Sequence, residues 1–266
     1  VRQAWQGPPA AEVRMLPELL PREALPAIGP DPEDRSIPIG VDELELAPWS
    51  WDPNVDPHFV AFGAPECGKS SLVRTFLSGI TTRYTPKEAK VLLLDYRRAH
   101  LGYIEGDHLL GYAASHDAAN ELLKGCAEAI RQRVPGPDVT QQQLRDRSWW
   151  SGVDLFVVVD DYELVATSLG NPLNQLAPYV SQGLDVGLHI VIARGMGGAG
   201  RAAFSDQVIA RMKDQVNPGL IMSGTKDEGA LLSDVKPSPL PPGRGTLVSR
   251  AGKVLVQTAW TPPTTD

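Results

Sequence analysis

The stretch GAPECGKS at residues 63–70 decides the fold of this chain. It fits G-x-x-x-x-G-K-[ST] at every fixed position, between an apolar run at 58–62 typical of a strand and a helical pattern at 70–78. Its glycines let the chain curl until main-chain N–H groups point at phosphate oxygens, and the helix adds its positive dipole end. The sequence therefore predicts a loop that binds the phosphates of a nucleoside triphosphate.

Nine consecutive residues are expected to hold this nucleotide. Lys69 is expected to reach the β- and γ-phosphates, and Ser70 to offer its hydroxyl to Mg²⁺. Cys67 contributes mainly its backbone, with a reactive thiol as the alternative. We therefore expect ATP and Mg²⁺ as cofactors, bound by Gly63, Ala64, Pro65, Glu66, Cys67, Gly68, Lys69, Ser70 and Ser71.

Two carboxylates follow the buried strand predicted at 154–159. Asp160 is expected to hold the water shell of the magnesium ion, as a second metal residue beside Ser70. Asp161 occupies the position where many ATPases carry a glutamate that polarises the attacking water, so Asp161 and Lys69 are the candidate catalytic residues. Because aspartate is one methylene shorter, Asp161 either reaches that water poorly or needs a water relay. A helix cap or a loop carboxylate is an equally good interpretation of Asp161.

The end of the strand predicted at 188–193 is also informative. Related ATPases usually place a polar side chain there to sense the γ-phosphate, which Ala193 cannot do. Arg194 is either a charge clamp for that phosphate or a surface salt-bridge partner, and we favour the salt bridge.

The remaining pattern predicts an α/β fold. Continuous apolar strands that alternate with helices indicate a parallel sheet covered on both faces, which binds ligands beyond the carboxyl ends of its strands. The predicted strands are 37–46 (with a turn), 58–62, 90–95, 154–159, 188–193 and 219–222, followed by a C-terminal hairpin of 246–249 and 253–258. The predicted helical segments are 70–78, 115–133, 140–149 with a capping box of Thr140 and Gln143, a start at Asn171-Pro172, 202–213, and a turn capped by Thr225 and Glu228.

Residues 1–36 differ from the rest of the chain because they are rich in proline and acidic groups. Prolines forbid long helices, yet this segment also carries apolar side chains that a free linker would not need. We expect an interdomain arm that docks either on its own domain, residues 37–266, or on a preceding one. A loosely ordered linker is the alternative.

Composition narrows the function classes. The 266 residues carry a net charge of −7 without a visible basic stripe, so no nucleic-acid partner is expected. Two cysteines cannot build a disulfide framework or a four-cysteine zinc site. No apolar run approaches the roughly 20 residues of a membrane-spanning helix. The start at Val1 without an initiator Met suggests a fragment of a longer protein, soluble by itself, with any membrane anchor upstream.

Several stretches together resemble one known family. They are the arm segment 13–21, the loop 63–71, and DYRR at 95–98, SWWSG at 148–152, VDDYE at 159–163, LIMSG at 220–224 and PPGRG at 241–245. Nearly the whole chain looks like the EccC type of FtsK/SpoIIIE ATPase from type VII (ESX) secretion systems, with a RecA/FtsK-like P-loop NTPase core. Because the end of the chain after Thr258 looks like a natural C-terminus, it resembles the last of several tandem ATPase domains.

The resemblance implies a location and partners. It implies the cytoplasmic side of the inner membrane, contact with a membrane secretion complex through upstream regions, and neighbouring ATPase domains in the same chain. It implies recruitment or export of small helical WXG100-type substrates, whose C-terminal signal docks on the terminal domain, and it leaves a homo-oligomeric ring open. Arg194, Arg201, Arg211 and Arg244 are all conceivable trans-acting fingers for a neighbour's γ-phosphate.

Two functions follow from these observations. One is an ATP-binding module with slow or degenerate hydrolysis, as Asp161 and Ala193 suggest. The other is a fully active translocation motor; a DNA translocase is least favoured because of the acidic charge.

Overall fold

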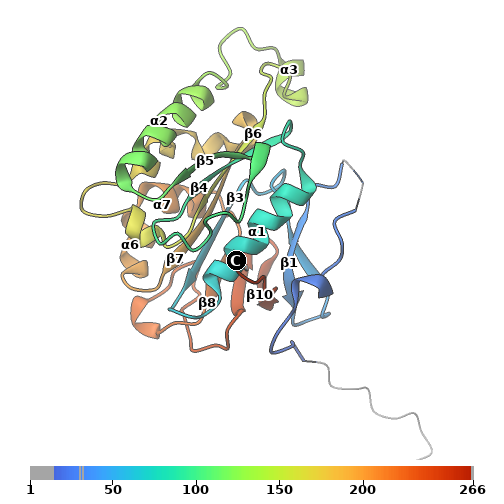
Figure 1. Ribbon diagram of the computed structural model, residues 1–266, viewed down its shortest axis with the longest axis vertical. Helices are drawn as coiled ribbons and strands as arrows, with labels where there is room; N and C mark the ends of the chain where they lie inside the picture. The colour runs from blue at the N-terminus through green and yellow to red at the C-terminus, as the bar shows by residue number, and fades with distance from the viewer. Residues whose placement is uncertain (1–14, 30, 32, 265–266) are drawn as a thin grey trace, which may run out of the picture.

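Six strands of a ten-stranded sheet run parallel and form one side of it, up to the edge strand β5 (Figure 1). The computed structural model describes residues 15–29, 31 and 33–264. The strand order is β2-β1-β10-β9-β8-β3-β7-β6-β4-β5, and the parallel part runs from β8 to β5. The carboxyl ends of these parallel strands therefore all lie at the same end of the sheet.

The elements have the following bounds. The strands are β1 Ile37–Asp42, β2 Pro48–Trp51, β3 His58–Gly63, β4 Ala89–Leu94, β5 Leu109–Ala113, β6 Asp154–Val159, β7 Leu188–Gly195, β8 Gly219–Met222, β9 Arg244–Ser249 and β10 Gly252–Thr258. The α-helices are α1 Lys69–Arg83, α2 His116–Arg131, α3 Gln141–Asp146, α4 Tyr162–Val165, α5 Gly183–Val186, α6 Ala199–Ser205 and α7 Gln207–Asp214. Short 3-10 helices are η1 Arg22–Ala24, η2 Gly106–His108, η3 Pro172–Gln175, η4 Ala177–Gln182 and η5 Lys226–Glu228.

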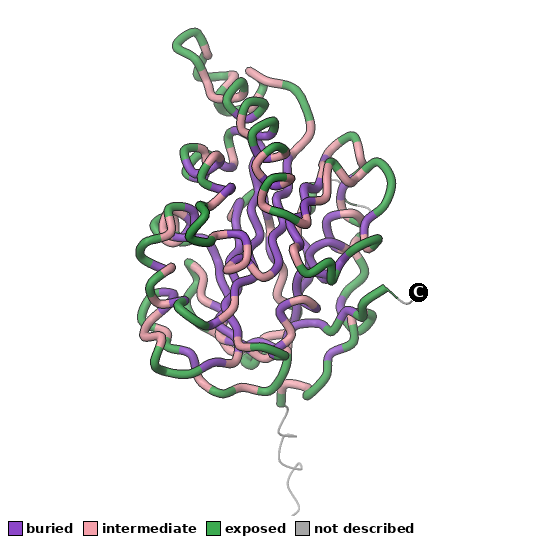
Figure 2. The backbone as a smooth tube through the Cα atoms, turned by 60° about the vertical axis from the view of Figure 1, so that its left-hand side comes forward, coloured by how far each residue is buried: buried purple, intermediate pink, exposed green. Residues whose placement is uncertain are grey.

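The core lies on both faces of the sheet, as the continuous apolar strands predict. In β3, Phe59 and Ala61 pack on the face covered by α1, while Val60 and Phe62 pack on the face covered by α2 and α7. Figure 2 shows buried chain along the central strands and exposed chain at the periphery. Burying both faces of each strand fixes the position of its carboxyl end, where the site residues follow.

Four antiparallel strands extend the sheet on the β8 side. The C-terminal hairpin β9–β10 is confirmed, and it pairs with β8 on one side and β1 on the other. The stretch predicted as one strand with a turn at 37–46 forms β1 and then turns into β2. The sheet is therefore mixed, with a parallel part from β8 to β5 and an antiparallel part from β9 to β2. Within the described part of the chain, no helix has the length and apolar character needed to cross a membrane.

The predicted elements are mostly confirmed, including the capping box of Thr140 and Gln143 and the Asn171 cap, which opens a 3-10 helix. Strands β2 and β5 lie in stretches for which no strand was predicted. The helix predicted over 202–213 breaks at Asp206, whose side chain accepts bonds from the N–H groups of Val208 and Ile209 and so begins a second helix. Thr225 makes no side-chain cap, contrary to expectation.

Candidate functional site

The loop between β3 and α1 curls as a phosphate-binding loop requires. Gly68 precedes α1 with φ +105°, a conformation that favours glycine. A Cβ on Gly63 would lie 2.3 Å from the Cys67 sulfur, so the loop closes only because Gly63 has no side chain. The Gly243 N–H donates to the Cys67 carbonyl at 2.8 Å, and the Ala64 N–H to the Ser223 carbonyl at 2.8 Å. The segments after β8 therefore support the loop from outside.

The charged end of the loop brings three predicted residues together. Lys69 is buried, and its Nζ donates to the Ala64 carbonyl across the loop at 3.0 Å. Ser70, in the first turn of α1, lies near the Asp160 carboxylate at the end of β6 and helps to lower its pKa. The ammonium, the hydroxyl and the carboxylate thus converge from α1 and β6 at the carboxyl edge of the sheet.

Asp160 is held by a histidine that sequence reasoning missed. His100 Nε2 lies 2.8 Å from Asp160 Oδ2, and both side chains are almost fully buried. The main-chain N–H of His100 donates to Oδ2 of Asp95, the residue after β4, at 2.7 Å. Burial alone would raise the pKa of Asp160, but the hydrogen bond with His100 and the nearby Ser70 hydroxyl outweigh it and hold this pKa below its usual value. Asp160 is therefore a fixed, ionised oxygen donor.

Asp161 has a partner of its own. Arg97 Nε lies 2.7 Å from Asp161 Oδ2, and the Asp161 backbone has φ +47°. Burial raises the pKa of Asp161, and the Asp160 and Glu163 carboxylates raise it further against the opposing charge of Arg97. The carboxylate expected to face the attacking water is thus engaged by an arginine.

The end of β7 does not face the phosphate loop through Arg194. Ala193 packs in the cluster of the α1 face, and Arg194 points to the opposite face of the sheet. Its Nη1 donates to the carbonyls of Gly195 at 2.6 Å and Gly197 at 3.1 Å. Within the described residues Arg194 pairs with no carboxylate, so the salt bridge favoured for it is wrong, and its position does not suit a clamp on a phosphate bound by the loop on its own chain.

The other loop residues have distinct environments. Pro65 and Glu66 are exposed, and Glu66 has φ +62°. Cys67 is buried, and burial raises the pKa of its thiol, which argues against the alternative of a reactive cysteine. The Ser71 hydroxyl accepts from the Thr261 N–H at 2.8 Å, so this side chain anchors the C-terminal segment.

The sequence carries no motif that marks Arg97 or His100 as residues of this site. Arg97 belongs to the DYRR stretch but has no motif role, and His100 is a lone histidine in a loop. Glu163 Oε2 accepts from the Gly195 N–H at 2.7 Å and ties the end of β6 to that of β7. Only the sheet order, which sequence periodicity does not give, places these residues beside one another.

The residues present fit ATP and Mg²⁺. The first turn of α1 leaves main-chain N–H groups without helical carbonyl partners, and the loop without a Cβ at Gly63 curls around them. Ser70 and Asp160 supply the oxygen donors that Mg²⁺ prefers, directly or through water. When bound, the ion would neutralise charge on the phosphates. The loop N–H groups and Lys69 would hold those phosphates, while His100 keeps Asp160 in place.

Comparisons with known proteins agree with this geometry. The model of the FtsK/SpoIIIE family matches residues 31–212. The ESX secretion system protein EccC of Thermomonospora curvata is 51% identical over 261 residues, which are 98% of this chain and 20% of that protein. The ESX-4 secretion system protein EccC4 of Mycobacterium tuberculosis is 43% identical over 264 residues, 99% of this chain and 21% of that protein. This chain spans about a fifth of these relatives.

Solved structures give the same result. The cytoplasmic domain of the T. curvata type VII secretion ATPase EccC superposes with a TM-score of 0.91 over 98% of this chain and 30% of that one. A structure of ATPases 2 and 3 of T. curvata EccC, in complex with a signal sequence peptide, also gives 0.91, over 98% of this chain and 46% of that one. Both are 51% identical to this chain. The chain therefore belongs to the FtsK/SpoIIIE family, with EccC ATPases of type VII (ESX) secretion systems among its relatives.

Proposed function

We propose that this chain is the ATP-binding terminal domain of a type VII secretion ATPase, and that it binds the C-terminal signal of small helical WXG100-type substrates. ATP–Mg²⁺ is held in the loop at 63–70 and hydrolysed slowly. The observation that carries slow turnover is the 2.7 Å pair between Arg97 and Asp161, which occupies the candidate base. A base must lie within hydrogen-bond reach of its water before its pKa matters.

A fully active motor remains the second candidate, supported by the assembled Lys69, Ser70 and Asp160. Turnover by the purified chain separates the two candidates. The binding module predicts tight ATP–Mg²⁺ binding with turnover well below the ~1 s⁻¹ at which ordinary enzymes begin. Robust turnover that Lys69→Ala abolishes would establish the motor.

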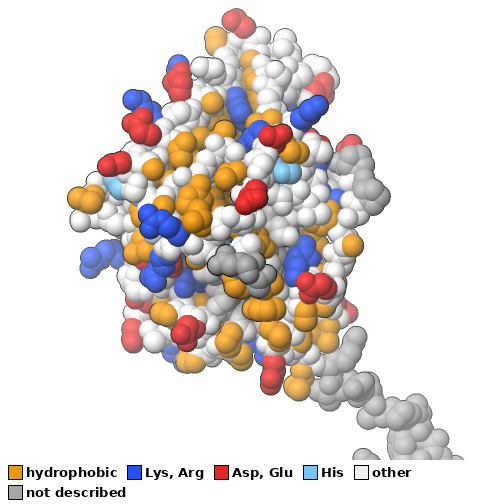
Figure 3. Space-filling view, viewed as in Figure 1, with side chains coloured by type: hydrophobic (Ala, Val, Ile, Leu, Met, Phe, Trp, Pro, Cys, Tyr) orange, Lys and Arg blue, Asp and Glu red, His pale blue; other side chains and the backbone are white. Residues whose placement is uncertain are grey.

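An apolar groove offers a place for the signal. A cavity of about 370 Å³ opens between α2 and the first residues of β4, β5 and β6. Its apolar lining includes Leu110, Leu122, Cys126, Ile130 and Leu155, while Lys90, Glu121 and Arg133 also lie along it. Hydrophobic side chains gather on this face of the molecule over β5 and α2 (Figure 3). Because these are the amino ends of the strands, the groove lies at the opposite end of the sheet from the nucleotide.

Two features of the groove favour a peptide ligand. Strand β5 is the last strand of the sheet and pairs only with β4 among the described residues, so its outer edge is open to another chain. Leu110 on this strand is 49% exposed. Apolar side chains of a signal segment would bury such surface, in keeping with the signal peptide bound by the related EccC.

A peptide titration tests this part of the proposal. C-terminal peptides of candidate substrates are titrated into the chain with and without ATP–Mg²⁺. We expect Leu110→Glu to weaken binding by at least about tenfold, since it places a charge in an apolar site. Leu44→Glu is the matched control, because Leu44 is 75% exposed between β1 and β2 and far from the groove lining. Equal effects of the two substitutions, or none, would contradict the groove.

The setting follows from the same proposal. We place the domain at the cytoplasmic side of the inner membrane, beside further ATPase domains of its own chain and a membrane secretion complex. Of the finger candidates, Arg244 and Arg211 donate to main-chain carbonyls of this chain, whereas Arg201 is exposed. In a ring, Arg201 is thus the candidate most free to reach a neighbour.

A further inference from the structure

A polar cavity opens at the carboxyl end of β7, on the face of the sheet opposite α1. It measures about 500 Å³ and has two walls. One wall is formed by the segment from Tyr162 to Asn174 after β6, and the other by the segment from Gly198 to Gln207 in and around α6. Arg194, near the end of β7, also lines the cavity. Most of the lining side chains are polar, in contrast to the apolar groove beside α2.

Arg194 brings a buried positive charge to this cavity. The residue is only 8% exposed. Its Nη1 donates to the carbonyls of Gly195 and Gly197, whereas its Nη2 and Nε donate no hydrogen bond to any of the described residues. Nη2 lies 3.7 Å from the position that a Cβ on Gly198, a residue of the lining, would take. A buried guanidinium with unused donors at a cavity favours a ligand that accepts hydrogen bonds.

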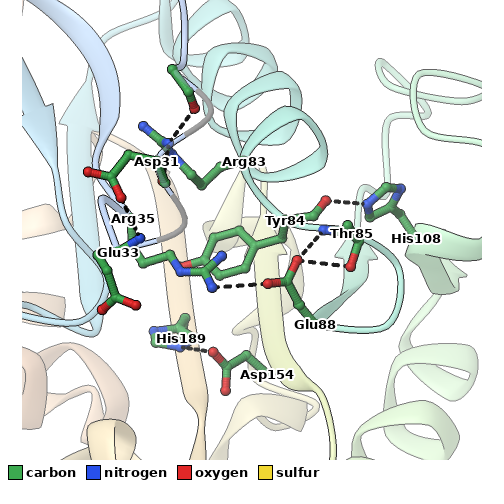
Figure 4. Close-up of polar contacts among 11 residues, drawn as sticks. Asp31, Glu33, Arg35, Arg83, Tyr84, Thr85, Glu88, His108, Asp154 and His189 are labelled. Carbon is green, nitrogen blue, oxygen red and sulfur yellow. Dashed lines mark hydrogen bonds and ion pairs between the residues drawn. The ribbon is translucent and has the colours of Figure 1, made fainter.

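Two ion pairs that fasten the arm to its own domain show the usual partner of a guanidinium. Arg83 Nη2, on a side chain that is 4% exposed, lies 3.0 Å from Asp34 Oδ2. Figure 4 shows Arg35 reaching Glu88, with 3.0 Å between Arg35 Nη2 and Glu88 Oε1. Arg194 has no carboxylate partner among the described residues. The place that a carboxylate takes beside Arg83 is therefore open to a ligand beside Arg194.

Asp206, the acidic residue of the lining, is already satisfied. Its carboxylate accepts from the Tyr162 hydroxyl at 2.9 Å, from Asn171 Nδ2 at 3.1 Å, and from the N–H groups of Val208 and Ile209 at 3.0 Å. Burial, and then the Asp206 charge, raise the pKa of Tyr162 well above its usual value, so its hydroxyl remains a donor at neutral pH. Four donors match the four lone-pair positions of a carboxylate, which leaves Asp206 no free position for a cation.

A second cation and two apolar side chains lie on the walls of the cavity. Arg201 on α6 lines the cavity and is exposed. Leu169 is 81% exposed and Phe204 is 77% exposed, and each is next to a lining residue in the sequence. Large apolar side chains left in water on both walls of a polar cavity favour a ligand that combines negative charge with apolar groups.

We infer that this cavity binds a carboxylate side chain of a partner protein, presented by a segment with apolar residues on either side of it. The Arg194 guanidinium supplies planar donors that match a carboxylate, and Arg201 adds a second positive charge. Leu169 and Phe204 supply apolar surface for the neighbouring residues of the segment, which a free inorganic anion would leave in water. The cavity and the groove proposed for the signal lie at opposite ends of the sheet, so this inference depends neither on that groove nor on ATP binding.

Two blocked heptapeptides isolate the charge in the experiment, GALELAG and its uncharged counterpart GALQLAG. Each is titrated into the full chain, and the arginine Nε–H signals are followed by NMR, with the Arg194 signal identified by its loss in Arg194→Lys. We expect GALELAG to shift the Arg194 signal and GALQLAG to bind at least about tenfold more weakly, since it lacks charge-assisted hydrogen bonds. Inorganic phosphate is the third ligand. Phosphate that binds at Arg194 as tightly as GALELAG would overturn the assignment to a peptide.

Variants on the walls provide the second measurement. Arg201→Gln should weaken GALELAG binding by about two- to fivefold, as expected for an exposed charge. Arg145→Gln is the matched control, because Arg145 is exposed on α3 and does not line the cavity. Leu169→Ser should weaken binding by about threefold through lost apolar contact. Leu110→Glu, in the signal groove, should leave it unchanged. An Arg194 signal that GALELAG does not move, or that GALQLAG moves equally, would overturn this inference and leave the proposed function standing.

Discussion

Arg97 Nε lies 2.7 Å from Asp161 Oδ2, and this pair joins the loop after β4 to the end of β6. Arg97 is itself 63% exposed at its side chain, whereas Asp161 is 17% exposed. The Arg97 guanidinium therefore approaches from solvent and covers a carboxylate that is mostly buried. Aspartate is one methylene shorter than glutamate, so Asp161 is less able to turn away from Arg97 and reach an attacking water.

We predict that Arg97→Gln frees Asp161 and raises ATP turnover on the order of tenfold, since a general base contributes ~10²–10⁴ when fully engaged. Arg98→Gln is the control: Arg98 is exposed, and its left-handed backbone is affected equally by glutamine and arginine. Phosphate release measures turnover, and Arg97→Gln combined with Asp161→Asn should return it to the parental level. A gain that survives the double substitution would show that Asp161 is not the base.

The pH dependence of that turnover has a defined sign. The pKa of Asp161 is raised by burial, then by Asp160 and Glu163, while Arg97 lowers it. Activity that needs the carboxylate is lost as pH falls through this raised pKa. Removing Arg97 raises the pKa further, so the acid limb of the Arg97→Gln profile should lie at higher pH. A limb that moves to lower pH would contradict this assignment.

The contact between His100 and Asp160 yields a stability prediction. His100→Ala removes a hydrogen bond to a buried charged carboxylate and should lower the free energy of unfolding by about 2 kcal/mol at neutral pH. It should also weaken the binding of ATP–Mg²⁺, because Asp160 loses the contact that orients it. His116→Ala, at the first residue of α2, is the control. Urea unfolding and calorimetry measure the two effects, and an unchanged unfolding midpoint would refute the first.

The contact between His100 and Asp160 also makes the free energy of unfolding depend on pH in acid. The folded-state pKa of Asp160 lies below its usual value, so its stabilising contribution is fully present above the unfolded pKa near 3.8. That contribution is lost as pH falls through the lower folded-state value. Because His100 is the largest factor lowering this pKa, His100→Ala should narrow the pH window between the two pKa values and lose less stability on acidification than the parent.

The parts of the fold that could be predicted are those that leave a local trace. The central strands are continuous apolar runs, and the phosphate loop is a motif in the right context. Strand β2 carries Pro48 and Ser50 among its four residues, and β5 carries Gly111 and is paired on one side, so neither shows a buried or alternating pattern. Sheet pairing, a long-range property, created both strands.

The candidate site divides in the same way. The loop residues and Asp160 follow from spacing, because a motif fixes their chemistry. His100 and Arg97 come from a loop after β4, and they reach Asp160 and Asp161 only because β4 and β6 are neighbours in the sheet. The salt bridge predicted for Arg194 was wrong for a related reason. Successive side chains along β7 point to opposite faces of the sheet, so Arg194 faces away from the side on which Ala193 packs.

Gly243 offers a test of the support beneath the phosphate loop. It has φ +76°, and an added Cβ would lie 2.4 Å from Gln257 Nε2. Gly243→Ala should therefore destabilise the chain by about 2–4 kcal/mol. It should also weaken ATP binding, because the Gly243 N–H donates to the Cys67 carbonyl in the phosphate loop. Gly252→Ala, at φ +122° with nothing within 4 Å of its Cβ, should cost only about 1–2 kcal/mol and spare ATP binding. Equal losses for both would contradict the role of Gly243.

The two cysteines report separately on the two proposed sites. Burial raises the pKa of Cys67 in the phosphate loop and that of Cys126 in the groove, the latter to about 11. The thiolate is the reactive form, so at pH 8 Cys126 in the folded chain should be alkylated at least about 100-fold more slowly than in urea. Alkylation mapped by mass spectrometry should then show ATP–Mg²⁺ protecting Cys67 and a signal peptide protecting Cys126. Protection of both thiols by either ligand alone would mean a global tightening of the fold, and would count against two separate sites at opposite ends of the sheet.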